Sequence, residues 1–203
     1  MDAFITGVVA GYGIAIPVGA IAVLIMDLGI RRGFTTAFFA GAGAATADFL
    51  YAGLAVVGGA TLAGLIDSIE TQLRVVSGVV LIVIAGYGLA RARRRPETEA
   101  RSLPNNADLA RTYVRFVALT VINPTTVVYF AAVITGLGVA DDMAVSDGLL
   151  FVIGAFLASL SWQTLIAGGS ALVGHRLSMR ARTIVSVAGN LVILAFGVLI
   201  LLR

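Results

Sequence analysis

The sequence contains no cysteine and no lysine, and its 203 residues include one histidine and 11 acidic residues. Without cysteine there can be no disulfide bond, no thiolate metal site and no thiol redox relay. Charged residues are also scarce, at 12% of the chain, against about 25% in an average soluble domain. Hydrophobic residues make up 59% of the chain. A soluble core could not hide so much apolar surface, so the composition indicates an integral membrane protein.

Six apolar runs are each near or above the roughly 20 residues that a helix needs to cross a hydrocarbon layer about 30 Å thick. They cover approximately residues 3–28, 33–64, 73–92, 114–138, 148–174 and 183–202. The runs lack the alternation of a membrane β-barrel, so the sequence predicts an all-α integral membrane protein with six transmembrane helices. No basic residue precedes the first run, so we expect it to be a span and not a cleaved signal peptide.

The 14 arginines indicate how the chain is oriented in the membrane. Twelve of them lie in three gaps between the runs, and these are Arg31, Arg32, Arg91, Arg93, Arg94, Arg95, Arg101, Arg111, Arg115, Arg176, Arg180 and Arg182. Short basic loops are retained in the cytoplasm. The three gaps therefore belong on the cytoplasmic side, which places both termini outside. Arginines beside spans contact lipid headgroups, so we expect membrane lipids and no nucleic acid as partners.

A weak internal repeat relates the two halves of the chain. Its landmarks are Pro17 with Pro124, Gly41 and Asp48 with Gly154 and Ser161, and Gly78 and Gly86 with Gly189 and Gly197. Each half has an odd number of spans, so the copies face opposite ways across the bilayer, as in many transporters. The sequence predicts one domain over residues 1–203, with inverted three-helix repeats at 1–92 and 114–203 and a cytoplasmic linker at 93–113.

The two matched prolines predict interruptions in helices one and four. A proline within a helix lacks an N–H group and displaces the carbonyl four residues earlier, so Pro17 frees that of Gly13 and Pro124 frees that of Thr120. Gly19, beside Pro17, and Asn123, beside Pro124, further weaken the helix at these two positions. Unwound backbone at membrane depth is tolerated only inside protein or beside a wet cavity. We therefore expect one central site between the breaks, the alternative being two simple kinks filled by neighbouring side chains.

Interrupted helices offer complementary chemistry to a ligand. The first turn of a half-helix presents unpaired N–H groups, and the last turn of its partner presents bare carbonyls. Together these groups could hold the carboxylate and the ammonium of an amino acid. An ion with its counter-ion would suit the same geometry.

Asp48 is the deepest acidic residue, with apolar or small neighbours on both sides in the second run. A charge at that depth costs about 2.5–3.5 kcal/mol, so Asp48 is a candidate for proton coupling or for binding a substrate ammonium. A hydrogen-bonded Asp48 that only locks helix packing is the alternative. Gln163 and Trp162 in the fifth run are candidates for the cavity wall, although hydrogen bonding between helices is their default role.

The residue types present in the sequence argue against several classes of function. The single histidine, His175, lies at the cytoplasmic end of the fifth run, where an interfacial role is expected. One deep acid, no cysteine and no paired catalytic groups argue against an intramembrane enzyme. No set of carboxylates, histidines or sulfurs suits a metal site, and no cofactor is expected. Gly7 and Gly11 allow close helix contact, within the monomer or between the subunits of a homodimer.

Several of these motifs together resemble the lysine exporter (LysE/RhtB) family of amino-acid exporters. The first two spans of that family are similar to Ile16-Pro17-Val18-Gly19-Ala20, to Gly29-Ile30-Arg31-Arg32-Gly33-Phe34, and to Gly41-Ala42-Gly43 leading to Asp48. A second landmark of the family is similar to Asn123-Pro124 followed by Tyr129-Phe130. The family usually has Pro-Gly-Pro where this chain has Pro17-Val18-Gly19, and often Asn-Pro-Lys where it has Asn123-Pro124-Thr125.

The resemblance implies that Pro17, Gly19, Asp48, Asn123 and Pro124 form the central binding and gating region. It also implies export from the bacterial cytoplasm across the inner membrane, driven by the proton gradient or the membrane potential. The leading hypothesis is therefore a secondary active exporter of an amino acid or derivative, working by alternating access and coupled to protons. An ion exporter or a passive channel on the same scaffold is the alternative.

Overall fold

The computed structural model describes residues 2–17, 19–94, 105–123, 126–127, 129–130 and 144–202, and only the backbone of 59–70, 91–94 and 179. All regular structure in these residues is helical. The helices are α1 (Ala3–Ala15), α2 (Ala20–Arg32), α3 (Phe34–Arg94), α4 (Asn106–Val121), α6 (Val145–Arg176) and α7 (Met179–Leu202). This all-α architecture agrees with the sequence prediction.

Short polar residues and one glycine fix several helix ends. Asp2 and Asn105 cap α1 and α4, because their side-chain oxygens accept hydrogen bonds from the N–H groups of Phe4 and Asp108 at 3.1 and 2.8 Å. Such caps satisfy N–H groups that the first helical turn leaves unpaired. Gly33 separates α2 from α3 with a φ of 92°. Only glycine adopts this conformation without strain, so Gly33 allows α3 to begin one residue after α2 ends.

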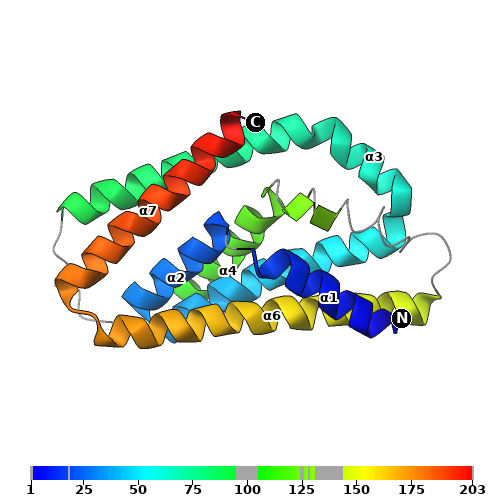
Figure 1. Ribbon diagram of the computed structural model, residues 1–203, viewed down its shortest axis with the longest axis horizontal. Coiled ribbons are helices and arrows are strands. Elements are labelled where there is room, and N and C mark those ends of the chain that lie inside the picture. Colours follow the sequence, from blue (N-terminus) through cyan, green and yellow to red (C-terminus); the bar gives the residue numbers. More distant parts are fainter. Residues whose placement is uncertain are drawn as a thin grey trace.

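The longest helix, α3, contains two of the predicted spans in one helix of 61 residues. Its spanning segments are Phe34–Gly58, here called the first arm, and Thr71–Ala90, the second arm. The helix turns between the arms and returns along the molecule (Figure 1). The sequence prediction placed a loop at 65–72, but the helix continues through it. The segment between the arms contains Gly59 and Gly64 and no proline, so no residue in it lacks the N–H group that a helical hydrogen bond needs.

Four segments of the described chain are long and apolar enough to cross a membrane: the two arms of α3, Val145–Arg176 and Arg180–Leu202. The bent pair α1 and α2 meets the same criterion when taken together. The predicted fourth span, 114–138, falls largely outside the described residues. Large apolar side chains such as Val57, Leu172 and Leu202 are exposed on the outside, as expected of a surface that faces lipid. The protein is thus a multi-pass membrane protein.

The helix ends next to the arginine-rich gaps gather at one end of the molecule. The C-terminal ends of α2, α3 and α6 and the N-terminal end of α7 lie together there, opposite the N-terminus of α1 (Figure 1). We call this the arginine-rich end. The predicted linker, 93–113, is shortened from both sides, because α3 extends to Arg94 and α4 begins at Asn106.

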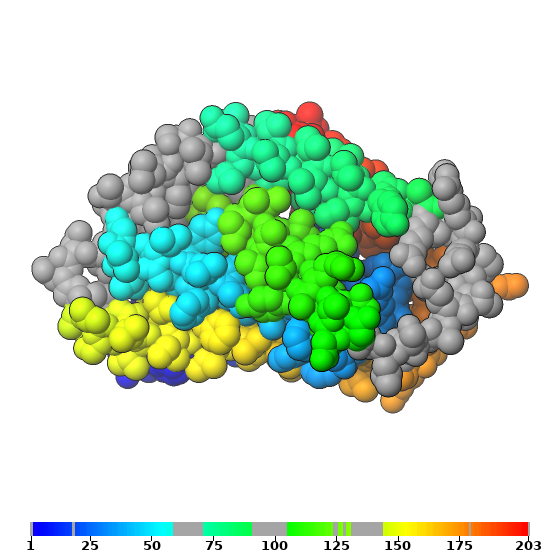
Figure 2. All heavy atoms as spheres, turned by 180° about the vertical axis from the view of Figure 1, so that it is seen from behind, coloured from blue at the N-terminus to red at the C-terminus, as the bar shows by residue number. Residues whose placement is uncertain are grey.

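Small residues bring the helices close together. Gly7 and Gly11 of α1 face α6 of the same chain, where a Cβ atom on either would collide with the backbone of Phe151 or Ala155. The G-x-x-x-G spacing therefore serves a contact within the monomer. In Figure 2, α4 fills the space between the two arms of α3 on the opposite face of the molecule. A homodimer stays a prediction.

We expect Gly7→Ala to lower the melting temperature of the purified protein in detergent. The added methyl group must push α1 away from the backbone of Phe151, and overpacking of this kind costs about 1–3 kcal/mol. The matched control is Gly169→Ala on α6, where a Cβ atom would meet open space. That variant should melt at or above the wild-type temperature, because alanine favours a helix by up to about 1 kcal/mol over glycine. Equal melting temperatures for the two variants would contradict the close contact of α1 and α6.

Candidate functional site

The chain leaves helical geometry between α1 and α2, and the two helix axes differ by 76° across this break. The last helical bond of α1 joins the N–H of Ile16 to the carbonyl of Tyr12 at 2.9 Å. Pro17 follows and has no N–H to donate. The first helical bond of α2 runs from the N–H of Val23 to the carbonyl of Gly19 at 3.2 Å. The N–H groups of the first turn of α2 therefore have no acceptor within the helix, and no side chain caps it.

The last carbonyl groups of α4 have partners within the protein. The expectation that Pro124 leaves the carbonyl of Thr120 free is therefore wrong. The carbonyl of Thr120 is not free, because it accepts the N–H of Asn123 at 3.1 Å in a tightened last turn. Hydroxyl groups from the two arms of α3 satisfy the next two carbonyls. Tyr51 donates to the carbonyl of Val121 at 2.6 Å, and the hydroxyl group of Ser77 is shared between the carbonyls of Ile122 and Leu73. Pro124 itself lies outside the described residues.

A cavity of about 340 Å³ lies between these two helix ends. Its walls include most of the predicted site residues, which are Gly13, Pro17, Gly19, Asp48, Thr120, Asn123 and Gln163. Trp162 is not among the lining residues. The lining also includes residues outside the predicted site, namely Thr126 and Tyr129 after α4 and Phe196, Leu199 and Ile200 of α7. The cavity thus joins both halves of the chain.

Asp48 supplies the acidic group of the cavity. It is only 3% exposed, and Ser159 of α6 donates a hydrogen bond of 2.6 Å to its Oδ2 atom. Ala44 and Ala52, one helical turn to either side, are fully buried. In the part of the chain that the structure describes, no basic side chain forms an ion pair with this carboxyl group. A buried acid without a cation can accept a proton or bind a positively charged group.

Two further polar groups of the cavity have no hydrogen-bond partner among the described residues. These are Oγ1 of Thr120 and Oε1 of Gln163, whose residues are 4% and 6% exposed. Gln163 lies one helical turn from Ser159, so its carboxamide and the carboxyl group of Asp48 occupy adjacent turns of the helix pair. An unpaired buried polar group costs about 1–3 kcal/mol. Both atoms would gain a partner from a ligand with hydrogen-bonding groups.

Tyr129 contacts the end of α1, before the break between α1 and α2. Its hydroxyl group donates to the carbonyl of Ala10 at 3.0 Å and packs against Gly13, where a Cβ atom would collide with it. Glycine at position 13 is therefore needed for this approach. The hydroxyl group of Tyr12, which also lies on α1, hydrogen bonds with that of Ser161 on α6 at 2.9 Å. No residue pattern in the sequence indicated the contact of Tyr129 with Gly13.

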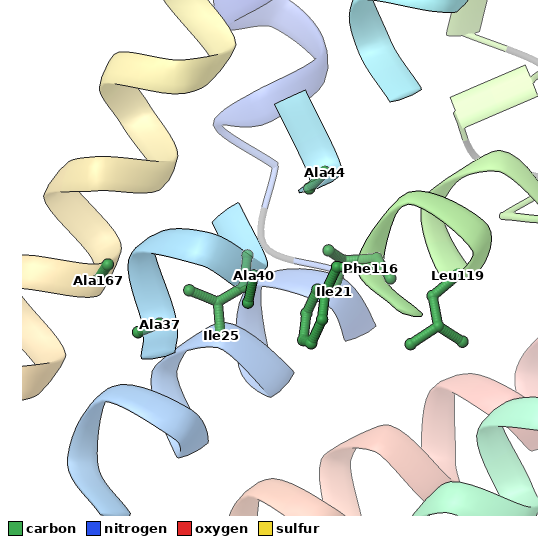
Figure 3. Packing of buried hydrophobic residues seen from close by; sticks show 8 residues of the cluster. All are labelled: Ile21, Ile25, Ala37, Ala40, Ala44, Phe116, Leu119 and Ala167. Atoms are coloured by element: carbon green, nitrogen blue, oxygen red, sulfur yellow. The ribbon is translucent and has the colours of Figure 1, made fainter. Parts of the chain in front are cut away.

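Two apolar clusters flank the cavity. The inner cluster, towards the arginine-rich end, comprises Ile21, Ile25, Ala37, Ala40, Ala44, Phe116, Leu119 and Ala167. Figure 3 shows these side chains converging from α2, α3, α4 and α6. The outer cluster, towards the start of α1, comprises Ala10, Ala52, Phe130, Phe151, Val152 and Ala155. Tyr51 and Phe130 stack there with ring centroids 5.7 Å apart.

The helices and the cavity define the class of this protein. It is a multi-pass helical membrane protein with an internal cavity that carries several polar groups. The family model described as LysE type translocator matches residues 13–203, so the chain belongs to this family. This confirms the resemblance drawn from the sequence. The protein is accordingly a membrane transporter and not an enzyme. Neither a curated protein nor a solved structure matches the chain.

We expect Tyr51→Phe to destabilise the protein, because the carbonyl of Val121 loses its donor at the end of α4. The loss should be about 1–3 kcal/mol, the cost of an unpaired buried acceptor. Tyr87→Phe is the matched control, since Tyr87 lies on the second arm of α3 and is 69% exposed. Thermal unfolding in detergent checks this. If both variants melt together with the wild type, the Tyr51 hydroxyl group does not support α4.

Proposed function

We propose that this chain is a secondary active exporter that moves an amino acid or a close derivative from the cytoplasm to the outside by alternating access. The observation that carries the proposal is the composition of the cavity. The uncapped first turn of α2 faces it together with buried Asp48 and the unpaired groups of Thr120 and Gln163. N–H groups at a helix start bind a carboxylate, and three oxygen acceptors suit the three donors of an ammonium group.

The packing of the halves supports an inverted repeat. Gly43, in the second predicted span, packs on Phe116 of α4, and Gly154, in the fifth, packs on Phe4 of α1. Each half thus places its middle span against the first span of the other half. Gly78 and Gly197, from the third and sixth spans, also contact each other. A two-fold axis in the membrane plane relates such pairs in transporters with inverted repeats.

The two clusters that flank the cavity provide gates for alternating access. The inner cluster separates the cavity from the arginine-rich end, which we assign to the cytoplasm because basic loops are retained there. The outer cluster separates it from the opposite side. Rocking of the two halves would open one cluster while the other stays closed. In this assignment both termini are outside, and the membrane is the inner membrane of a bacterium.

Asp48 would couple transport to the proton gradient in this cycle. In the described residues the carboxyl group has a hydroxyl partner, Ser159, and no cation. Its charge can therefore be neutralised by a proton in one state and by the substrate ammonium in the other. Competition between proton and substrate for one carboxyl group produces antiport.

We expect Asp48→Asn to abolish proton-driven transport in reconstituted vesicles, reducing it to the level of vesicles without protein. Asparagine keeps the size of the side chain but neither ionises nor neutralises an ammonium group. Transport of a labelled amino acid is measured against an imposed pH gradient, and melting temperature checks the fold. Asp147→Asn is the control, because Asp147 is exposed in the first turn of α6.

If transport by Asp48→Asn still depends on the pH gradient and is undiminished, Asp48 does not couple transport to protons. The wild-type protein also separates the exporter from a channel or an ion exporter. An exporter of amino acids saturates with its substrate and accumulates it against a concentration gradient. Flux that never saturates and never exceeds equilibrium would instead indicate a passive channel.

A further inference from the structure

One wall of the cavity is formed by side chains without polar atoms. Phe196, Leu199 and Ile200 of α7 line it along about one helical turn. Their spacing places them on one side of the helix. The wall is a surface against which a ligand could remove apolar area from water.

The α7 wall and the polar groups lie on different sides of the cavity. Phe196 and Ile200 pack with Ala20, at the start of α2, and with Leu81 on the second arm of α3. Asp48 lies instead on the first arm of α3, against α6. Helix α7 packs mainly on α3 and α2, with Gly197 against Gly78 of the second arm. The start of α2 therefore separates an apolar subsite from an ammonium subsite.

The charges available in the cavity limit what a substrate can carry. Among the described lining residues Asp48 is the only charged one, and no arginine joins it. One carboxyl group neutralises one ammonium group. A second cationic group, as in a basic amino acid, would be buried against the α7 wall without a partner, and so would the carboxylate of an acidic side chain. Burying an unpaired charge is strongly unfavourable.

We propose that the substrate is an amino acid with an apolar side chain, and that Phe196, Leu199 and Ile200 form the subsite for that side chain. This inference rests on the proposed function as an amino-acid exporter. The substrate lies across the start of α2, with its carboxylate on the N–H groups there and its ammonium towards Asp48. A volume of about 340 Å³ is at the small end of the range of about 300–1,000 Å³ for ligand sites and suits a single amino acid.

The first test measures competition in vesicles that contain the wild-type protein. Transport of labelled L-leucine is followed with unlabelled L-leucine, L-phenylalanine, L-lysine or L-glutamate at 100-fold excess. Phenylalanine should compete as leucine does, while lysine and glutamate leave the transport of leucine within twofold of its uncompeted rate. Competition by lysine or glutamate equal to that by leucine overturns the apolar subsite.

The second test shortens the wall with Leu199→Ala. The half-saturation concentration for L-leucine should rise about tenfold or more, since one missing methylene in an apolar pocket changes selectivity by about 10–200-fold. The value for L-alanine should stay within twofold, because its methyl group does not extend to α7. Leu191→Ala is the control, being on the same helix, 51% exposed against 55% for Leu199, and outside the cavity. An equal change for leucine and alanine contradicts the assignment.

The two proposals fail in different ways. If lysine or glutamate is transported with saturation and leucine is not, the apolar subsite is wrong while export of amino acids stands. If none of the four amino acids is transported or raises the melting temperature of the purified protein, the proposed function fails and the subsite with it.

Discussion

The constraint on which this structure depends is that the interior of a bilayer offers no water to backbone polar groups. Every interruption of a helix must find partners in the protein or in a cavity. At the end of α4 the partners are Tyr51 and Ser77, whose hydroxyl groups satisfy the carbonyls of Val121 and Ile122. At the start of α2 no side chain caps the helix, and its first turn faces the cavity instead. The N–H groups at the start of α2 therefore face the cavity without a side-chain partner.

Close packing of small residues makes such a cavity compatible with a stable fold. Lipid tails are as apolar as the helices, so helix association in membranes depends on close van der Waals contact. Gly7, Gly154 and Gly174 allow backbone to touch backbone between α6 and its neighbours, and alanines of α3 are fully buried beside Asp48. Gly41 of α3 packs against Gln163 of α6, and Asp48, on the same pair of helices, accepts the hydrogen bond of Ser159. Packing and the polar site therefore depend on the same contacts.

The sequence predicted those features that follow from local chemistry. Hydropathy indicated the apolar helices, and Pro17 and Gly19 lie between the end of α1 at Ala15 and the start of α2 at Ala20. It could not predict that Tyr51 and Ser77 cap α4, because each contact joins residues far apart in the chain. The expectation for Thr120 failed because a helix end can tighten by one residue and pair its own carbonyl. The α7 wall carried no signal, since Leu199 resembles every other leucine in an apolar run.

The two helix ends that border the cavity are not equivalent. The start of α2 contributes unpaired N–H groups to the cavity, whereas at the end of α4 the carbonyls of Val121 and Ile122 are paired with hydroxyl groups of α3. The second half contributes side chains to the cavity instead, including Thr120, Tyr129 and Gln163. A zwitterion has two different ends, so a symmetric site would bind it in two orientations. If the substrate is the amino acid proposed above, its carboxylate would lie at the start of α2 and its ammonium at Asp48, and this asymmetry would define a single orientation.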